Sequence, residues 1–297
     1  MKVKFILLLG FCFIQYNSVS QDLLDETDIE MPLLRAKASF KNSRVINAAS
    51  LETTPKGVLD FRISHRFGRV NGGLYEFFGL DQASMRMAFD YGITDRLQIG
   101  IGRSTYEKTV DGSIKYRLLW QTQGSEQMPI SVVWVSSMSV NALRFDNTLY
   151  ERTFDTRLNY VHQLLIGRKF TDDITVQLMP TVVHRNFVLT REEENTVWVA
   201  AAAARWKFVK RVAINVEYFY VPEGQLADGF TNSLSLGFDI ETGGHVFQLH
   251  LTNSPLMVEK GFITETTGKW TKGDIHFGFN ISRVFTIVKP KKPKEEE

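Results

Sequence analysis

The segment 274–285 near the end of the chain alternates between large apolar residues and small or polar ones. The large apolar residues stand at every second position: Ile275, Phe277, Phe279 and Ile281. The positions between them are held by His276, Gly278, Asn280 and Ser282. Successive side chains of a β-strand point to opposite faces. The pattern therefore predicts a strand with one apolar face and one polar face.

Eleven further segments show the same alternation, and together they predict the fold. The twelve predicted strands are 58–67, 84–91, 97–104, 113–122, 129–141, 154–167, 174–184, 197–208, 212–220, 233–240, 245–252 and 274–285. An even number of strands with alternating faces is typical of a transmembrane barrel. We therefore expect an all-β protein, a transmembrane antiparallel up-and-down β-barrel of about 12 strands.

The connections between these strands alternate between short and long. The short ones are 94–96, 171–173, 210–211 and 242–244, with 123–127 slightly longer, and they are rich in turn-forming residues. The long ones are 68–83, 142–153, 185–196, 221–232 and 253–273, whereas Val110-Asp-Gly112 is interpreted as a short turn on that side. Outer-membrane barrels have short periplasmic turns and long outer loops. This predicts a Gram-negative outer-membrane protein with both termini in the periplasm.

The two ends of the chain complete the predicted organisation. Residues 1–20 combine Lys2 and Lys4 with a short apolar run and a small-residue cleavage site, so they predict a signal peptide. Residues 21–56 are a periplasmic lead-in and a candidate plug, 57–286 form the barrel, and 287–297 are a disordered periplasmic tail. The single cysteine, Cys12, lies in the signal peptide. Disulfides and cysteine-ligated metals are therefore excluded from the mature chain.

Composition and charge agree with a barrel. The chain is 43% hydrophobic, yet its mean hydropathy is −0.14, as expected when only alternate positions must be apolar. The net charge is +2, and removal of Lys2 and Lys4 brings it to zero. A nucleic-acid-binding protein usually carries a clustered basic excess. We therefore expect outer-membrane lipid and no nucleic acid as a partner.

Several stretches of the chain resemble a known family. They are 57–68 (GVLDFRISHRFG), 79–82, 91–96 (YGITDR), 228–232 and 238–250 (FDIETGGHVFQLH). These stretches resemble the outer-membrane β-barrel family of Bacteroidota-type bacteria catalogued as domain of unknown function 5777. The resemblance covers nearly all of the mature chain. It implies an outer-membrane barrel and supplies no catalytic residues.

The polar faces of the predicted strands gather a charged set that would line the lumen. This predicted lumen polar cluster contains Asp60, Arg62, Arg86, Asp90, Lys115, Arg117, Arg157, Glu217, Asp239, His250 and His276. Arginine and carboxylate side chains form bidentate pairs that suit a water-poor interior. We therefore expect a closed or narrow polar lumen with a structural, interaction or small-solute role. The alternative is a selective channel for small anions or small solutes, because rings of basic side chains select anions.

Enzymatic and metal sites are weakly indicated. Ser64 and His65 are the nearest candidates for a lipid hydrolase, but adjacent strand residues point to opposite faces. The histidines have no metal-binding spacing, so we expect no catalytic residues, no metal and no cofactor. The sequence leaves two features undecided. The apolar 72–80 loop is predicted to cover the mouth, plug the barrel or meet a protein partner. The side chain of His162 is predicted to face lipid, unless a bulge after Asn159 turns it inward.

Overall fold

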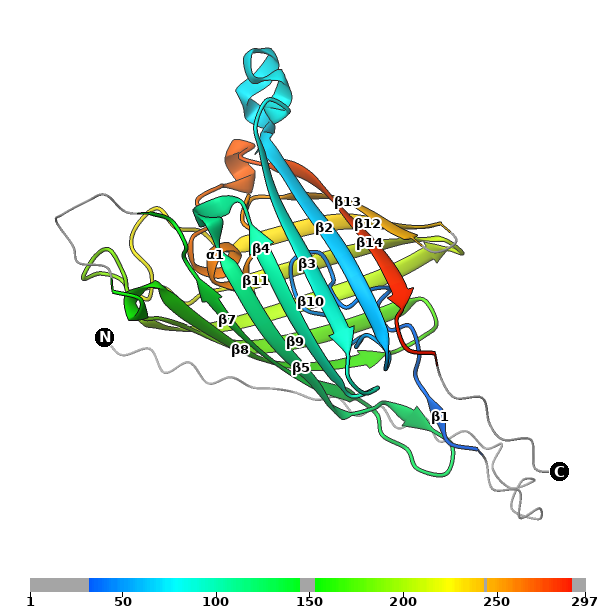
Figure 1. Cartoon of the computed structure of the whole chain (residues 1–297). Helices are drawn as coiled ribbons and strands as arrows, with labels where there is room; N and C mark the ends of the chain where they lie inside the picture. Colours follow the sequence, from blue (N-terminus) through cyan, green and yellow to red (C-terminus); the bar gives the residue numbers. More distant parts are fainter. Residues whose placement is uncertain (1–31, 145–152, 243–244, 290–297) are drawn as a thin grey trace, which may run out of the picture.

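The computed structural model describes residues 32–144, 153–242 and 245–289, and they form one closed antiparallel barrel (Figure 1). Its strands are β2 (Val58–Arg69), β3 (Ala83–Gly92), β4 (Leu97–Ser104), β5 (Val110–Leu119), β7 (Ser131–Val140), β8 (Leu158–Lys169), β9 (Ile174–Arg185), β10 (Thr196–Val209), β11 (Val212–Tyr220), β12 (Ser233–Thr242), β13 (His245–Thr252) and β14 (His276–Thr286). Each pairs with its neighbours in sequence, and β14 pairs with β2 to close the ring. The predicted twelve-stranded barrel is confirmed.

Several predicted strand boundaries were wrong, and two of these errors affect the site. The segment Val110-Asp-Gly112 is not a turn but the first part of β5, and the hairpin before it is closed by η2 (Tyr106–Lys108). An Asp-Gly pair is a strong turn signal, but here Asp111 faces the lumen and forms an ion pair there. Strand β8 begins four residues later than predicted, because η3 (Asp155–Arg157) precedes it.

The two ends of the barrel differ. At the end where β2 begins and β14 stops, here called the terminal end, β1 (Leu34–Arg35) and β6 (Thr122–Gln123) pair outside the barrel. At the opposite end, called the loop end, η1 (Val70–Gly79) projects away from the barrel as a knob (Figure 1). No helix among the described residues is long and apolar enough to cross a membrane. Residues 1–31 and 290–297, which hold the predicted signal peptide and most of the predicted tail, lie outside the described residues.

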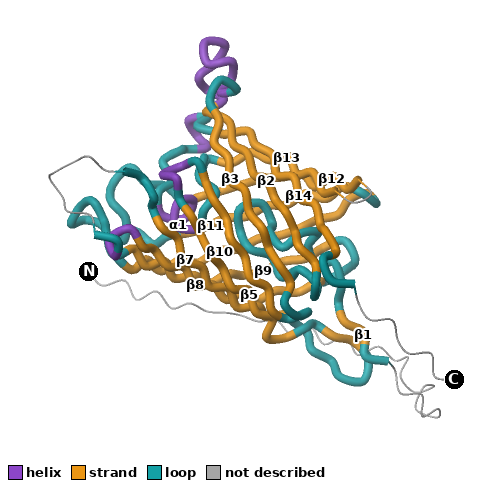
Figure 2. The backbone as a smooth tube through the Cα atoms, viewed as in Figure 1, coloured by secondary structure: helices purple, strands orange, loops and turns teal. Residues whose placement is uncertain are grey.

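Two segments enter the barrel from opposite ends and fill it. The N-terminal plug, residues 39–54, includes a hairpin closed by the bridge between Arg44 and Ala49. The loop plug, residues 253–266, belongs to the long connection before β14 and contains α1 (Glu259–Thr264). Figure 2 shows both among the strands as loop and helix segments. Most of their side chains are buried, so the two segments pack against the inner wall of the barrel.

Candidate functional site: the plugged lumen

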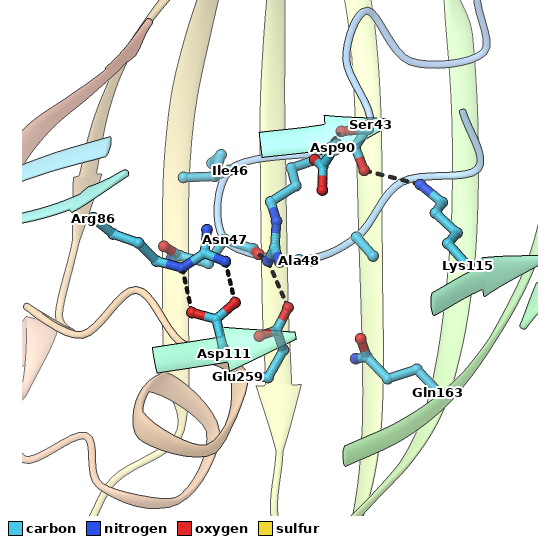
Figure 3. Close-up of polar contacts among 12 residues, drawn as sticks. Ser43, Ile46, Asn47, Ala48, Arg86, Asp90, Asp111, Lys115, Gln163 and Glu259 are labelled. Carbon is cyan, nitrogen blue, oxygen red and sulfur yellow. Dashed lines mark hydrogen bonds and ion pairs between the residues drawn. The ribbon is translucent and has the colours of Figure 1, made fainter. Parts of the chain in front are cut away.

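One half of the inner wall carries six of the eleven residues in the predicted cluster. In β2, β3 and β5 the inward positions hold Asp60, Arg62, Arg86, Asp90, Lys115 and Arg117, and each is less than a tenth exposed. Arg86 forms a two-pronged ion pair with Asp111, its Nε donating to one carboxylate oxygen at 3.0 Å and its Nη2 to the other (Figure 3). A buried arginine is tolerated when a carboxylate accepts two parallel hydrogen bonds from its guanidinium group in this way.

The neighbouring strand β4 makes room for these pairs by presenting glycine inward. A Cβ on Gly102 would lie 2.4 Å from Nη2 of Arg86, and one on Gly100 would lie 2.3 Å from Oδ1 of Asp90. Both distances are far below van der Waals contact. The alternation in β4 therefore pairs apolar outward residues with glycines whose place is taken by charged side chains of β3 and β5.

The opposite half of the wall, in β7 to β11, carries the apolar inward residues of the lumen. Its inward residues include Val133, Val135, Val161, Leu165, Met179, Val183, Val197, Val199, Ala201, Ala203 and Phe219. Phe40 and Leu51 of the N-terminal plug, with Leu256, Phe262 and Ile263 of the loop plug, pack against them. The plugs thus complete a hydrophobic core inside the barrel. Burial of such surface stabilises them by about 25 cal/mol per Å².

The N-terminal plug satisfies the charges of the polar wall with its backbone. Nζ of Lys115 donates to the carbonyl oxygens of Ser43, at 3.0 Å, and of Glu52. Nη2 of Arg117 donates to the carbonyl oxygen of Leu51 at 2.6 Å. Without the plug, these buried cations would lose partners that each contribute on the order of 1.5–3 kcal/mol.

The tip of the plug holds a carboxylate from the far wall. Glu217 of β11, which is 1% exposed, accepts from three successive backbone N–H groups. The N···O distances are 3.2 Å from Ile46, 2.9 Å from Asn47 and 2.9 Å from Ala48. Consecutive N–H groups that converge in this manner form an anion nest. The wall supplies the anion and the plug supplies the nest, so this contact fixes the depth of the plug.

The two plugs are joined by an ion pair in the middle of the barrel. Nη1 of Arg44 lies 2.6 Å from Oε1 of Glu259, and the side chains are 13% and 2% exposed. Figure 3 shows Glu259 below the turn that carries Asn47 and Ala48. We call this contact the clasp. Neither partner can move away without leaving a buried charge unpaired, which is costly in a low-dielectric interior.

Most residues of the predicted cluster line the lumen, but Arg157 does not. It lies in η3, one residue before β8, where its Nη1 donates to the carbonyl oxygen of Leu143 at the loop end. The predicted strand began at residue 154, four residues too early, and so wrongly included Arg157. The prediction also missed Asp111, interpreted as a turn residue, and Glu259 of the clasp. The apolar residues 256–258 and 262–263, unusual for an exposed loop, were the available signal for the loop plug.

The histidines form no metal site among the described residues. His250 and His276 lie on neighbouring strands, with His250 opposite Gly278 and His276 opposite Thr252. Nδ1 of His276 is 2.8 Å from the carbonyl oxygen of Phe67, so that nitrogen is the donor. His276 therefore ties β14 to the end of β2 at the loop end.

His162 faces lipid, and no bulge follows Asn159 in the pairing of β7 with β8. Its Nδ1 lies 2.9 Å from the hydroxyl oxygen of Ser136, its cross-strand neighbour. The described residues provide no hydrogen bond to its other ring nitrogen. Ser64 is buried and faces the lumen, whereas the His65 ring stacks on Phe279 outside, so they form no catalytic pair.

The loop plug is anchored to the mouth of the barrel by a small charged group. Lys260 pairs with Glu265 and lies 3.7 Å from Glu107. Burial raises the pKa of Glu265, although Lys260 opposes the shift. Burial also raises the pKa of Tyr106 to about 12. The protonation of Glu265 is therefore linked to the position of the loop plug.

Residues 40–285 match the family described as membrane bound beta barrel domain (DUF5777). The chain belongs to this family. The match begins within the N-terminal plug, so the plug is part of the family's domain and not an appendage to it. The resemblance found in the sequence is confirmed, and the barrel is membrane-bound.

Solved structures of outer-membrane barrels share parts of this architecture. An outer membrane channel from Pseudomonas putida F1 is 13% identical, with a TM-score of 0.48, over 80% of this chain and 98% of its own. The NanC porin is 8% identical, with a TM-score of 0.47, over 76% and 98%. Outer membrane phospholipase A from Escherichia coli is 8% identical, with a TM-score of 0.44, over 79% and 91%. No curated protein matches the chain.

Proposed function

We propose that the protein is a non-enzymatic outer-membrane barrel, with its termini in the periplasm, that is closed at rest by its two plugs. Its role is structural, in interaction with a partner, or in the controlled passage of a small solute. The fit of the N-terminal plug carries this proposal. Charged side chains of the wall form hydrogen bonds with backbone atoms of the plug: Lys115 and Arg117 on one side, and Glu217 on the other. A segment that merely occupied a pore would not need such matched contacts.

A cleft at the loop end supports closure. It has a volume of about 540 Å³ and opens between β2, β3 and β14, beneath the knob. Arg66 lines it and is 1% exposed. Nη2 of Arg66 donates to Oδ1 of Asn47 at the plug tip at 2.7 Å. The inner end of the cleft therefore lies at the tip of the N-terminal plug.

A disulfide between plug and wall tests closure. An ideal Cβ at Gly237 would lie 3.2 Å from Cγ1 of Ile46, and a disulfide needs roughly 3 Å between one Cβ and the other sulfur. The described residues contain no cysteine, so Ile46→Cys with Gly237→Cys forms one defined pair. In planar bilayers we expect no step conductance from the wild type or from the oxidised variant. Steps in the oxidised, stapled protein would refute a closed barrel.

A small-anion channel is the second candidate, and the charge of the wall favours it. Among the described residues, seven buried basic and five buried acidic side chains lie on barrel strands. The basic set is Arg62, Arg66, Arg86, Lys115, Arg117, Arg185 and Arg205. If the wild type conducts and the staple stops it, the plug is a gate. Current carried mainly by anions, with less anion preference after Arg62→Gln or Arg117→Gln, would then support this candidate.

The knob supports an interaction role. It neither covers the mouth nor enters the barrel, and its tip residues Leu74 and Tyr75 are 82% and 95% exposed. Exposed apolar groups of this size are typical of contact sites with other proteins. A photo-crosslinking residue at Tyr75 in intact cells should give one defined adduct, and the same residue at Glu223, on another loop at this end, should not. Equal labelling at both positions would contradict a specific partner.

A further inference from the structure

The terminal end of the barrel carries a cleft that the plugs do not explain. It has a volume of about 230 Å³ and lies between the chain before the plug and the end of β5. Its lining residues include Leu33, Arg35, Arg96, Leu118 and Trp120. One side of the cleft is therefore cationic and the other apolar.

Three arginines surround the indole ring of Trp120. Their guanidinium carbons lie 4.4 Å (Arg35), 4.6 Å (Arg96) and 5.1 Å (Arg117) from the ring centroid. Arg117 is buried and donates to the N-terminal plug, whereas Arg35 and Arg96 are exposed. Among the described residues, neither of these two has a carboxylate within the 4.0 Å of an ion pair. A ring can hold a cation, but gathering cations around it leaves a repulsion that a bound anion would relieve.

The short strands outside the barrel hold Arg35 in this place. Arg35 pairs with Thr122 in the β1–β6 ladder, and the backbone N–H of Ala36 donates to the carbonyl oxygen of Gln121 at 2.9 Å. Arg96 is fixed by a 3.1 Å hydrogen bond from its Nη1 to the carbonyl oxygen of Leu118. The ladder contributes nothing to barrel closure. Its visible effect is to set the Arg35 guanidinium beside Trp120.

The apolar side of the cleft continues onto the membrane face of the barrel. The outward residues Ile114, Tyr116 and Leu118 of β5 are 46%, 37% and 43% exposed, and Leu118 also lines the cleft. A hydrocarbon chain on this column would lead directly to the guanidinium groups. Glu126 lines the cleft as well. The two positive charges of Arg35 and Arg96 and the one negative charge of Glu126 give the cleft a net charge of +1.

We propose that this cleft binds an anionic phospholipid from the leaflet at the terminal end of the barrel. Arg35 and Arg96 hold the phosphate, since guanidinium groups match its oxygens with paired hydrogen bonds. An acyl chain lies along Ile114, Tyr116 and Leu118. The excess of one positive charge suits a lipid with net charge −1, such as phosphatidylglycerol, over zwitterionic phosphatidylcholine. The proposal requires only that the barrel spans a membrane, and it is independent of closure or conduction.

Native mass spectrometry of the full chain, released from mixed phosphatidylglycerol and phosphatidylcholine vesicles, tests the proposal. The wild type should retain one phosphatidylglycerol in preference to phosphatidylcholine. Arg35→Gln with Arg96→Gln should weaken that retention by roughly tenfold or more, the loss expected for one charge-assisted contact. The matched control is Arg168→Gln with Arg283→Gln, which removes the same charge from two arginines at the same end. Those arginines each lie over a single phenylalanine.

Two results would overturn the site. One is equal loss of phosphatidylglycerol in both double variants, which would indicate general attraction by the rim. The other is equal retention of the two lipids by the wild type. Arg35→Ala alone guards against misfolding, because the described residues give the Arg35 side chain no hydrogen bond that the barrel needs, and it should show a partial loss. Heat-dependent migration on gels checks that every variant keeps a folded barrel.

Discussion

Replacing Glu217 with glutamine should loosen the N-terminal plug while leaving the barrel intact. Glutamine keeps the shape and one acceptor oxygen, but it loses the charge and places an amide donor against the nest. Oε2 of Glu217 lies within hydrogen-bond distance of all three N–H groups, from Ile46, Asn47 and Ala48, so a glutamine oxygen at that position keeps three hydrogen bonds that are now neutral. Each bond loses about 1 kcal/mol with the charge, and the amide nitrogen takes the place of Oε1, which accepts from Asn47 at 2.9 Å.

The sum is about 3 kcal/mol of plug stability, which corresponds to a roughly 100-fold larger population of the open plug. Hydrogen exchange of the peptide that spans residues 44–50 measures that population, because these amides exchange only when the plug leaves the wall. Peptides from β13 and β14 serve as internal reference, and Glu223→Gln, an exposed glutamate, is the matched control. Unchanged protection at residues 46–48 in Glu217→Gln would refute the nest as an anchor of the plug.

Three further predictions follow from the site. Asp111→Ala should cost about 3–5 kcal/mol in urea unfolding because it leaves Arg86 buried and unpaired, whereas Asp111→Leu with Arg86→Met should recover most of that loss; equal losses would contradict the pairing. Since burial raises the pKa of Glu265 above its ordinary 4.5, the protonated form suits the folded loop plug. This contribution to stability is complete below pH 4.5 and is lost as the pH rises through the raised pKa. Hydrogen exchange of residues 254–266, corrected for intrinsic rates, should therefore slow on acidification. Glu265→Gln should remove this pH dependence. His162→Leu should leave folding in lipid vesicles unchanged or improve it by up to about 1–2 kcal/mol, because it removes a polar group from the lipid face; loss of a measurable lipase activity would instead reveal a catalytic role.

The strands were predictable because two solvents impose a period of two on the sequence. Each barrel strand meets lipid on one face and a packed lumen on the other, so the pattern survives without any knowledge of partners. The charged half of the lumen followed from the same alternation. The apolar half did not, because Val133, Val135 and Val197 alternate with lipid-facing residues that are also apolar. With both faces apolar, period two gives no contrast.

The plugs were harder to predict because their contacts are long-range. Asn47 contacts Glu217, 170 residues away in sequence, and the clasp joins residues 44 and 259. The backbone groups of the plug have no side-chain pattern that would reveal them as ligands for Lys115 or Glu217. The prediction for Asp111 was wrong for a related reason. Its Asp-Gly sequence is a local turn signal, and only the ion pair with Arg86, on β3 beyond the intervening β4, shows that Asp111 belongs to a strand. The missing information lay in which strands become neighbours.

The split lumen also explains how two plugs joined by one ion pair fit inside the barrel. Each plug has an apolar side that fits β7–β11, and the N-terminal plug also has polar groups that fit β2–β5, so it cannot rotate without placing carbonyl groups against valines. The clasp then couples the ends of the barrel. Because a coupling free energy is reciprocal, the amount by which the clasp lets the N-terminal plug stabilise the loop plug equals the amount by which it lets the loop plug stabilise the N-terminal plug.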